Sequence, residues 1–264
     1  MTYFQAIVLA IIEGLTEFLP VSSTGHMIIG TALMGMEPSP FVKLFTIVIQ
    51  LGTILSVLVL YFKRFFKSLD FYYKLVVAAI PASILGLLFN DFIDSLLESP
   101  LTVAVMLVVG GLALLFVDKW FNKPQIDNSD DISYKQSFVI GLYQCLALIP
   151  GTSRSASTIV GAMTQNLTRK AAAEFSFFLA IPMMLGASVV KLYKFFKEGH
   201  TFSGEEVNLL IIGNVIGFIV AIIAIKTFIN LLTRYGFKVF GWYRIIVGLV
   251  IIGLILSGQS LQLI

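Results

Sequence analysis

Six apolar stretches of the chain are each long enough to cross a lipid bilayer as a helix, which takes about 20 predominantly apolar residues. Charged residues are scarce within these stretches and frequent between them. The pattern therefore predicts an all-α integral membrane protein with six full spans. We place the spans at residues 44–62, 73–90, 100–117, 173–192, 207–226 and 241–258.

Two further apolar regions, 3–36 and 136–168, are broken by polar residues and prolines. The pieces beside each break have about 10 to 14 residues, the length typical of re-entrant half-helices. We therefore predict two re-entrant broken-helix hairpins. The breaks fall at Glu13, Glu17, Pro20 and Ser22-Ser23-Thr24-Gly25-His26 in the first region, and at Pro150-Gly151-Thr152-Ser153-Arg154-Ser155 in the second.

The two halves of the chain resemble each other. Sliding the sequence along itself until Pro20 falls on Pro150 also places Ser23 on Ser153. Each half then reads as one broken hairpin followed by three spans, and the odd number of crossings makes the second half enter from the opposite side. This predicts an inverted-topology repeat, with its functional site near the bilayer midplane between the breaks. The predicted units are residues 1–118, a cytoplasmic connecting loop at 119–135, and residues 136–264.

Composition narrows the class of protein further. Hydrophobic residues make up 58% of the 264 residues and charged residues only 12%, whereas a soluble domain carries about 25% charged residues. The lipid bilayer is therefore expected to be the solvent for much of the surface. The net charge of +3 is spread over loops, so we expect no nucleic-acid partner. A single cysteine, Cys145, excludes a disulfide within the chain.

The basic residues predict the orientation in the membrane. We count four on the side of the amino terminus, side A, and thirteen on the opposite side, side B. Because cytoplasmic loops are enriched in lysine and arginine, side B is predicted to be cytoplasmic, with both termini outside. Side A has Lys43, Lys191, Lys194 and Lys197; side B has Lys63, Arg64, Lys67, Lys74, Lys119, Lys123, Lys135, Arg169, Lys170, Lys226, Arg234, Lys238 and Arg244.

Glu13 and Glu17 carry candidate chemistry in the first break. They are four residues apart, so on a helix they share one face, where two carboxylates repel each other. An ionisable pair in an apolar segment indicates function, such as binding a cation, sharing a proton or facing water. The alternative is a solvated helix end near the membrane surface.

The hydroxyl groups of Ser22, Ser23 and Thr24 follow Pro20 at the start of the next predicted helix. Serine at such a position commonly caps the helix, but the unpaired backbone N–H groups there also form a site for phosphate. His26 follows three residues after Ser23, within reach if the turn is helical. We interpret it as a catalytic group, with a structural hydrogen bond as the alternative.

The second break repeats this design with the opposite charge. Pro150 and Gly151 end a half-helix. Thr152 and Ser153 can cap the helix that follows, and Arg154 lies in its first turn. Arginine is unfavourable at a helix amino terminus, because it adds to the positive potential there. That potential suits a bound di-anion, and a guanidinium can hold two phosphate oxygens at once. The alternative is a structural ion pair between Arg154 and a glutamate of the other half.

Several polar and aromatic residues receive structural interpretations. We assign Gln50 and Gln144 to hydrogen bonds between helices and give Glu174 no catalytic role. Trp242 and Tyr243 are typical of the aromatic belt at a membrane interface.

The longest motifs of the chain resemble a known family. EGLTEFLPVSSTGH at residues 13–26 and PGTSRSAST at 150–158 are similar to the two signature motifs of undecaprenyl-diphosphate phosphatase, the bacterial family associated with bacitracin resistance. IVIQLG at residues 47–52 also matches, and the resemblance covers essentially the whole chain.

The resemblance implies hydrolysis of undecaprenyl diphosphate to undecaprenyl phosphate and inorganic phosphate, which recycles the lipid carrier of cell-wall synthesis and confers bacitracin resistance. It also implies a multi-pass protein of the bacterial cell (inner) membrane, with a divalent cation, Mg²⁺ or Ca²⁺, and an active site facing the extracytoplasmic side. The expected partners are the polyprenyl diphosphate lipid and the lipid bilayer, and a homodimer is left open.

For this chemistry we expect Ser23 to attack the terminal phosphorus and Arg154 to stabilise the transferring group. Glu17 is expected to act as the base of Ser23 or to hold it in position. His26 is expected to protonate the leaving group or activate water, and direct attack by water stays an alternative. Glu13 and Glu17 are the predicted metal ligands. The predicted substrate-binding residues are Ser22, Thr24, Thr152, Ser153 and Ser155.

Two other functions fit the pattern less fully. A transporter of the lipid phosphate would also use an inverted repeat with paired broken helices. A lipid-binding scaffold would leave the clustered nucleophile, acids and arginine unexplained. Phosphate release in detergent, where there are no compartments, distinguishes the enzyme from both.

Overall fold

The structure, a computed structural model, describes residues 1–66, 69–97, 99–258 and 261 of the chain. Lys67, one of the basic residues counted on side B, lies outside these ranges. In the described part, six helical segments are long and apolar enough to cross a membrane, which confirms the predicted all-α membrane protein. They are α3 (Pro40–Val48) together with α4 (Gln50–Leu60), α5 (Leu69–Leu88), α7 (Pro100–Trp120), α10 (Arg169–Lys197), α11 (Gly204–Tyr235) and α12 (Lys238–Leu256).

Both broken regions fold as pairs of short helices joined by a turn. The first pair is α1 (Tyr3–Thr16) and α2 (Ser23–Leu33). In the second, α8 (Tyr134–Gln144) continues into the 3₁₀ helix η3 (Cys145–Leu148), and α9 (Arg154–Thr164) follows the turn. Each of these helices is shorter than a membrane span, and their re-entrant placement in a bilayer stays a prediction.

The two pairs share their local structure, and the N-cap residues at the starts of their helices occupy corresponding positions. Helices α1 and α8 each begin with a capping box, built on Thr2 and on Ser133. Helices α2 and α9 each begin after a serine with positive φ, 66° at Ser22 and 75° at Ser153. Ser22, and not Ser23, is therefore the counterpart of Ser153, so the register predicted from the prolines is off by one position. The caps, rather than the prolines, fix where each helix starts.

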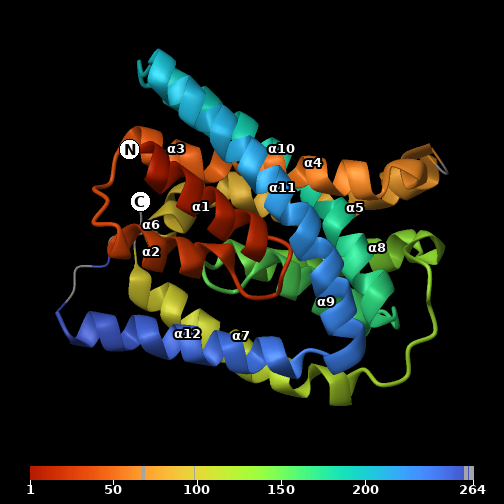
Figure 1. Ribbon diagram of the computed structural model, residues 1–264. Helices are drawn as coiled ribbons and strands as arrows, with labels where there is room; N and C mark the ends of the chain where they lie inside the picture. The colour runs from red at the N-terminus through yellow and green to blue at the C-terminus, as the bar shows by residue number, and fades with distance from the viewer. Residues whose placement is uncertain (67–68, 98, 259–260, 262–264) are drawn as a thin grey trace.

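The halves exchange packing partners across the molecule (Figure 1). Helix α1 of the first half packs on α11 of the second, and α8 of the second half packs on α5 of the first. In the same way α4 packs on α11 and α10 packs on α5, while α7 and α12 lie side by side. Two halves related by a two-fold axis would pack in this way. Their opposite insertion in a membrane stays a prediction.

The ends of several elements differ from the predicted spans. A short helix, α6 (Asn90–Leu97), follows α5 where no element was predicted. Helices α10 and α11 run past the predicted spans 173–192 and 207–226, and they project together at the top of Figure 1. The extensions of α10 add basic residues at both of its ends, such as Arg169 and Lys197. Helix α11 begins at a capping box on Ser203, and its extension past residue 226 includes the buried Phe228.

Candidate active site between the two broken helices

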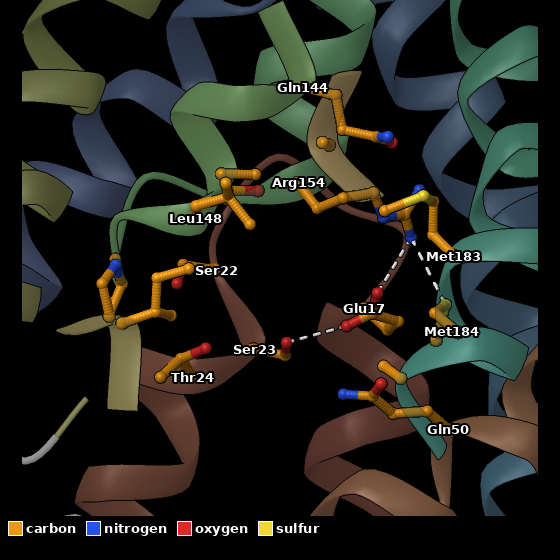
Figure 2. Close-up of a pocket in the computed structure, with 17 residues that line it drawn as sticks. Glu17, Ser22, Ser23, Thr24, Gln50, Gln144, Leu148, Arg154, Met183 and Met184 are labelled. Carbon is orange, nitrogen blue, oxygen red and sulfur yellow. Dashed lines mark hydrogen bonds and ion pairs between the residues drawn. The ribbon is translucent and has the colours of Figure 1, made fainter. Parts of the chain in front are cut away.

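A cavity of about 270 Å³ lies where the two turns meet (Figure 2). Its polar side chains come from both turns, with one glutamine from α4 and one from α8, and its apolar side chains come mainly from α5, α6, η3 and α10. The cavity therefore has a wall of hydroxyl and charged groups beside an apolar wall. The polar side chains are Glu17, Ser22, Ser23, Thr24, Gln50, Gln144, Ser153 and Arg154, and the apolar ones include Ala82, Ile93, Leu148, Met183 and Met184.

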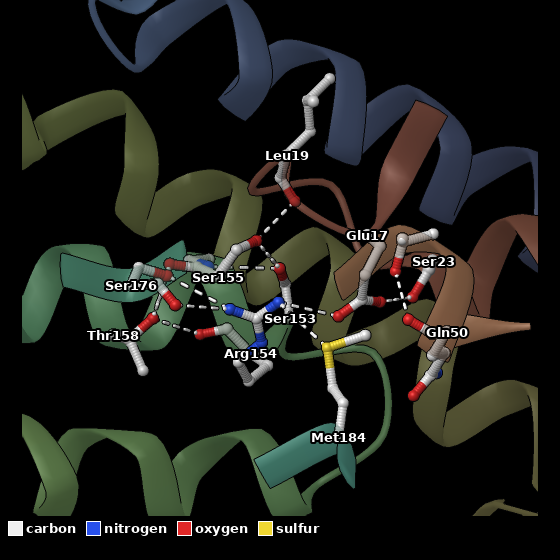
Figure 3. Close-up of polar contacts among 12 residues, drawn as sticks. Glu17, Leu19, Ser23, Gln50, Ser153, Arg154, Ser155, Thr158, Ser176 and Met184 are labelled. Carbon is white, nitrogen blue, oxygen red and sulfur yellow. Dashed lines mark hydrogen bonds and ion pairs between the residues drawn. The ribbon is translucent and has the colours of Figure 1, made fainter. Parts of the chain in front are cut away.

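Glu17 connects the two turns. Its Oε2 accepts a hydrogen bond from Ser23 Oγ at 2.8 Å, and its Oε1 accepts one from Arg154 Nη2, also at 2.8 Å (Figure 3). Only 8% of the Glu17 side chain and 15% of the Arg154 side chain are exposed. The ion pair that the sequence left as an alternative for Arg154 is therefore present. It joins the candidate nucleophile, base and cation in one hydrogen-bonded chain.

Ser176 of α10 holds the other edge of the Arg154 guanidinium. Arg154 Nη1 donates to the Ser176 carbonyl at 3.0 Å and to its hydroxyl at 3.4 Å, and the Thr158 hydroxyl lies 2.6 Å from the Ser176 hydroxyl (Figure 3). Because the guanidinium is planar, contacts at both terminal nitrogens set its orientation. Its Nε is buried and has no hydrogen-bond partner in the described residues, which leaves one N–H for an anion.

Each turn holds a strained serine directly before a helix. Positive φ at Ser22 and Ser153 costs a non-glycine residue about 1–3 kcal/mol, and such strain clusters at functional sites. Ser153 accepts a hydrogen bond from Ala156 N, as predicted for a cap, whereas Ser22 forms no side-chain cap. The first N–H groups of α2 therefore lack the usual serine partner, an arrangement suited to binding an anion.

Glu13 and Glu17 are buried, with 1% and 9% of their surface exposed, so the interpretation as a solvated helix end is wrong. Glu13 interacts with Glu17 and with Gln50, and its Oε1 has no hydrogen-bond partner in the described part. Such an oxygen beside a second carboxylate fits a hard cation, since Mg²⁺ binds one or two carboxylates together with substrate phosphates. The described residues contain no cluster of three acidic, histidine or cysteine side chains that could hold a metal.

His26 is not among the described residues that line the cavity. Its Nδ1 lies 2.8 Å from the Ser22 carbonyl oxygen and its Nε2 lies 2.7 Å from the Tyr243 hydroxyl. The rings of His26 and Tyr243 stack with 5.5 Å between their centroids. These contacts match the structural alternative given for His26, and its part in proton transfer stays a prediction. Tyr243, interpreted as a belt residue, has this contact within the molecule as well.

The predicted substrate-binding residues divide into two sets. Ser155 is fully buried; its hydroxyl donates to the Leu19 carbonyl at 2.5 Å and lies 3.1 Å from the Ser153 hydroxyl. It therefore braces the first turn against the second. The Thr152 hydroxyl is buried without a partner in the described part. The residues that do line the cavity are Ser22, Thr24 and Ser153.

Two residues at the site were given other roles by the sequence. Gln144 lines the cavity with both polar side-chain atoms buried and unpartnered in the described part, so its predicted hydrogen bond between helices is wrong. When the two halves are aligned on Ser22 and Ser153, Gln144 falls on Glu13. The alignment on the prolines did not show this correspondence, which would have indicated a place for Gln144 in the site. Arg244, counted on side B, is fully buried and contacts both turns. Without it, twelve basic residues remain on side B.

The sequence matches the family model described as "Bacitracin resistance protein BacA" over residues 6–250, which include both turns and every residue of the cavity. The chain belongs to this family. It is 64% identical over 253 residues to a protein of Flavobacterium johnsoniae named undecaprenyl-diphosphatase, with 96% of each chain covered. Relatives with the same name are 55% identical in Porphyromonas gingivalis, over 99% of each chain, and 48% identical in Bdellovibrio bacteriovorus, over 100% of each. The resemblance inferred from the motifs is confirmed.

Proposed function

We propose that the protein hydrolyses undecaprenyl diphosphate to undecaprenyl phosphate and inorganic phosphate. The reaction recycles the lipid carrier of cell-wall synthesis and confers bacitracin resistance. Two independent findings support this proposal. Relatives that match nearly the whole chain are named undecaprenyl-diphosphatase, and the cavity contains side chains suited to phosphoryl transfer.

The observation that carries the proposal is the two-sided cavity, in which Ser23, Glu17 and Arg154 adjoin an apolar wall. A prenyl diphosphate has the same division, because an anionic head group is attached to a hydrocarbon chain. Arg154 offers a planar fork to two phosphate oxygens, and the flexible side chains of Met183 and Met184 suit an irregular apolar ligand. Phosphoryl transfer depends mainly on such positioning and charge stabilisation.

In the first step, Ser23 Oγ attacks the terminal phosphorus, the bond from that phosphorus to the bridging oxygen breaks, and undecaprenyl phosphate leaves. The Ser23 proton passes to Glu17 Oε2, its hydrogen-bond partner at 2.8 Å, and from there to the leaving oxygen. Phosphate oxygens that accept hydrogen bonds from the Arg154 N–H groups displace Glu17 from Arg154. Substrate binding thereby releases the Glu17 carboxylate to accept the proton.

In the second step, water attacks the phosphoserine, the bond from Ser23 Oγ to phosphorus breaks, and inorganic phosphate leaves. The proton that water loses returns to Ser23 Oγ by way of Glu17. Direct attack by water, with Ser23 only orienting it, is the alternative route. The two routes differ in whether phosphate becomes bound to Ser23.

A divalent cation, Mg²⁺ or Ca²⁺, is the proposed cofactor. Glu13, whose Oε1 lacks a partner in the described part, would hold it together with Glu17, and Gln50 lies beside Glu13. When bound, the cation neutralises charge on the phosphate oxygens and helps to orient the head group.

We further propose that this multi-pass protein lies in the bacterial inner membrane with its cavity open to the extracytoplasmic side. The amino-terminal end of α1 and the carboxyl-terminal end of α12 lie on the left of Figure 1, whereas the segment linking α7 to α8 lies on the right. The excess of basic residues on the side of that segment supports a cytoplasmic location. Ile93 of α6, which lines the cavity, belongs to the end with the termini.

Purified protein in detergent tests the proposal, because detergent removes the compartments that transport requires. We expect inorganic phosphate to be released from undecaprenyl diphosphate, to stop when a chelator removes divalent metal, and to return when Mg²⁺ or Ca²⁺ is added. A folded, metal-loaded protein that releases no phosphate would contradict the phosphatase assignment and favour transport. Full activity after thorough chelation would contradict only the cofactor.

Ser23→Ala and Ser22→Ala form a matched pair for the same assay. Each removes one hydroxyl from the same turn, but only the Ser23 hydroxyl is bonded to Glu17. We expect Ser23→Ala to lose nearly all activity and Ser22→Ala to retain much more, and we expect acid-quenched wild-type protein to carry phosphate on Ser23. Inversion of configuration at phosphorus would instead indicate a single displacement by water.

A further inference from the structure

Arg244 is the largest fully buried side chain among the described residues. It lies in α12, which packs along α7, and it takes part in no ion pair among the described residues. A guanidinium stays charged in proteins, and burying a charge without an opposite charge is unfavourable. An apolar side chain of similar volume would suit the contact between two helices better. The arginine therefore needs an explanation other than helix packing.

The hydrogen bonds of Arg244 supply that explanation, because three of them reach the two turns of the active site. Nη1 donates to the Thr152 carbonyl at 2.9 Å and to the Pro20 carbonyl at 3.3 Å, and Nη2 donates to the Gly151 carbonyl at 2.9 Å. Two further bonds, from Nε and Nη2, go to carbonyls of α7. One rigid group thus joins both turns and fixes them to a membrane-spanning helix.

We propose that Arg244 is a positioning residue that sets the distance between the two turns, and so brings Ser23 and Arg154 to the same phosphate. Pro20 precedes Ser23 by three residues, and Thr152 precedes Arg154 by two. The planar guanidinium has a fixed separation between its nitrogens, so each turn can move only if it gives up its bond. The catalytic part of this inference rests on the proposed function; the structural part does not.

Gly110 of α7 offers a way to disturb Arg244 without changing it. A Cβ at Gly110 would lie 2.3 Å from Arg244 Nη2 and 2.8 Å from its Cζ, so Gly110→Ala has to displace the guanidinium. Gly110 does not line the described cavity, and the substitution removes none of the proposed catalytic side chains. Gly253→Ala in α12 is the matched control, because its Cβ would meet nothing within 4 Å. Arg244→Lys, which keeps the charge and loses the fork, is the second variant.

Two measurements on the full-length protein in detergent test the inference. Hydrogen exchange of the peptides that cover residues 18–25 and 148–155 reports on the turns independently of catalysis. Phosphate release from undecaprenyl diphosphate gives kcat and KM. We expect faster exchange in both turns of Gly110→Ala and Arg244→Lys, with kcat reduced on the order of 100-fold, as for an ångström-scale misplacement. We expect KM to change much less, and Gly253→Ala to behave as wild type.

The outcomes separate the inference from the proposed function. Turns that stay protected in both variants, or loosening of one turn alone, would overturn the claim that Arg244 ties them together. Unchanged kcat with both turns loosened would overturn its positioning role in catalysis. If both turns loosen while even the wild-type protein releases no phosphate, Arg244 still joins the turns and the phosphatase assignment is the part that fails.

Discussion

The partners of Arg154 differ in what they contribute to its side chain. Ser176 offers a neutral carbonyl and hydroxyl, which orient the guanidinium without neutralising it, whereas Glu17 is an anion like the proposed substrate. A phosphate of the proposed substrate would therefore compete with Glu17, and not with Ser176, for the guanidinium. On the proposed mechanism the arginine would keep its orientation while its anionic partner changes, so we expect little reorganisation on binding.

Replacing the single residue Gln144 with an apolar one is expected to raise the stability of the protein and to lower its activity. Its amide is buried in the wall of the cavity that Arg154 also lines (Figure 2), and neither polar atom has a partner in the described part. A buried unsatisfied polar group destabilises a fold by about 1–3 kcal/mol. We therefore expect Gln144→Leu to unfold at a higher temperature and to have a lower kcat/KM, because it loses a hydrogen-bonding group for the phosphates.

The matched control for this variant is Gln165→Leu, since Gln165 lies outside the described lining of the cavity. Thermal unfolding in detergent and phosphate release are measured for both proteins. We expect Gln165→Leu to keep the wild-type kcat/KM. Wild-type activity in Gln144→Leu would show that the amide does not contact the substrate, and a lower unfolding temperature would show that it has a structural partner.

At the scale of elements, the sequence predicted the helices because their signals are local. Apolar length marks the spans, and Pro20 and Pro150 mark the breaks. The register between the halves was off by one position because the caps at Ser22 and Ser153 depend on backbone conformation. The contacts of Arg244 with both turns could not be predicted, because they join residues far apart in the chain that only tertiary packing brings together.

The contact between α4 and α11 depends on a glycine of the motif at residues 47–52. Gly52 N donates to Asn214 Oδ1 at 2.7 Å, and a Cβ at Gly52 would lie 2.1 Å from the Asn214 carbonyl oxygen. Gly52→Ala must therefore push the helices apart and break this bond. We expect it to lower the free energy of unfolding by about 1–3 kcal/mol, as for other overpacked contacts, and to reduce the amount of folded protein.

Gly186→Ala in α10 is the control for Gly52→Ala, because a Cβ there would meet nothing within 4 Å. Alanine is favoured over glycine inside a helix by about 0.5–1 kcal/mol, so this variant is expected to unfold at the wild-type temperature or slightly above it. Thermal unfolding in detergent compares the two proteins. Equal stability of Gly52→Ala and wild type would mean that α4 and α11 can separate without loss.

For the whole molecule, the exchange of partners between the halves explains why the site lies in the interior. Helix α1 packs on α11 and α8 packs on α5, so each turn is held by helices of the other half. Glu17 of the first turn meets Arg154 of the second, and neither half contains the hydrogen-bonded chain alone. The site is therefore expected to form only when both halves have folded together.

The orientation of the molecule in the membrane is the last prediction. Replacing Cys145, the single cysteine, with serine gives a background for cysteine labelling. Ser95 of α6 is exposed at the end with the termini, and Asp127 is exposed in the segment between α7 and α8. Ser129 of that segment is unsuitable, because it is fully buried and accepts a hydrogen bond from Arg64 Nη2 at 2.7 Å.

We expect a thiol reagent that cannot cross membranes to label Ser95→Cys and to spare Asp127→Cys in intact cells with a permeable outer barrier. The physical reason is the excess of lysine and arginine on the side of Asp127, which favours the cytoplasm. Lysed cells serve as the control, because both positions should react there. Labelling of Asp127→Cys alone in intact cells would show that the orientation is the opposite of the predicted one. The cavity would then open towards the cytoplasm, and inorganic phosphate would be released inside the cell.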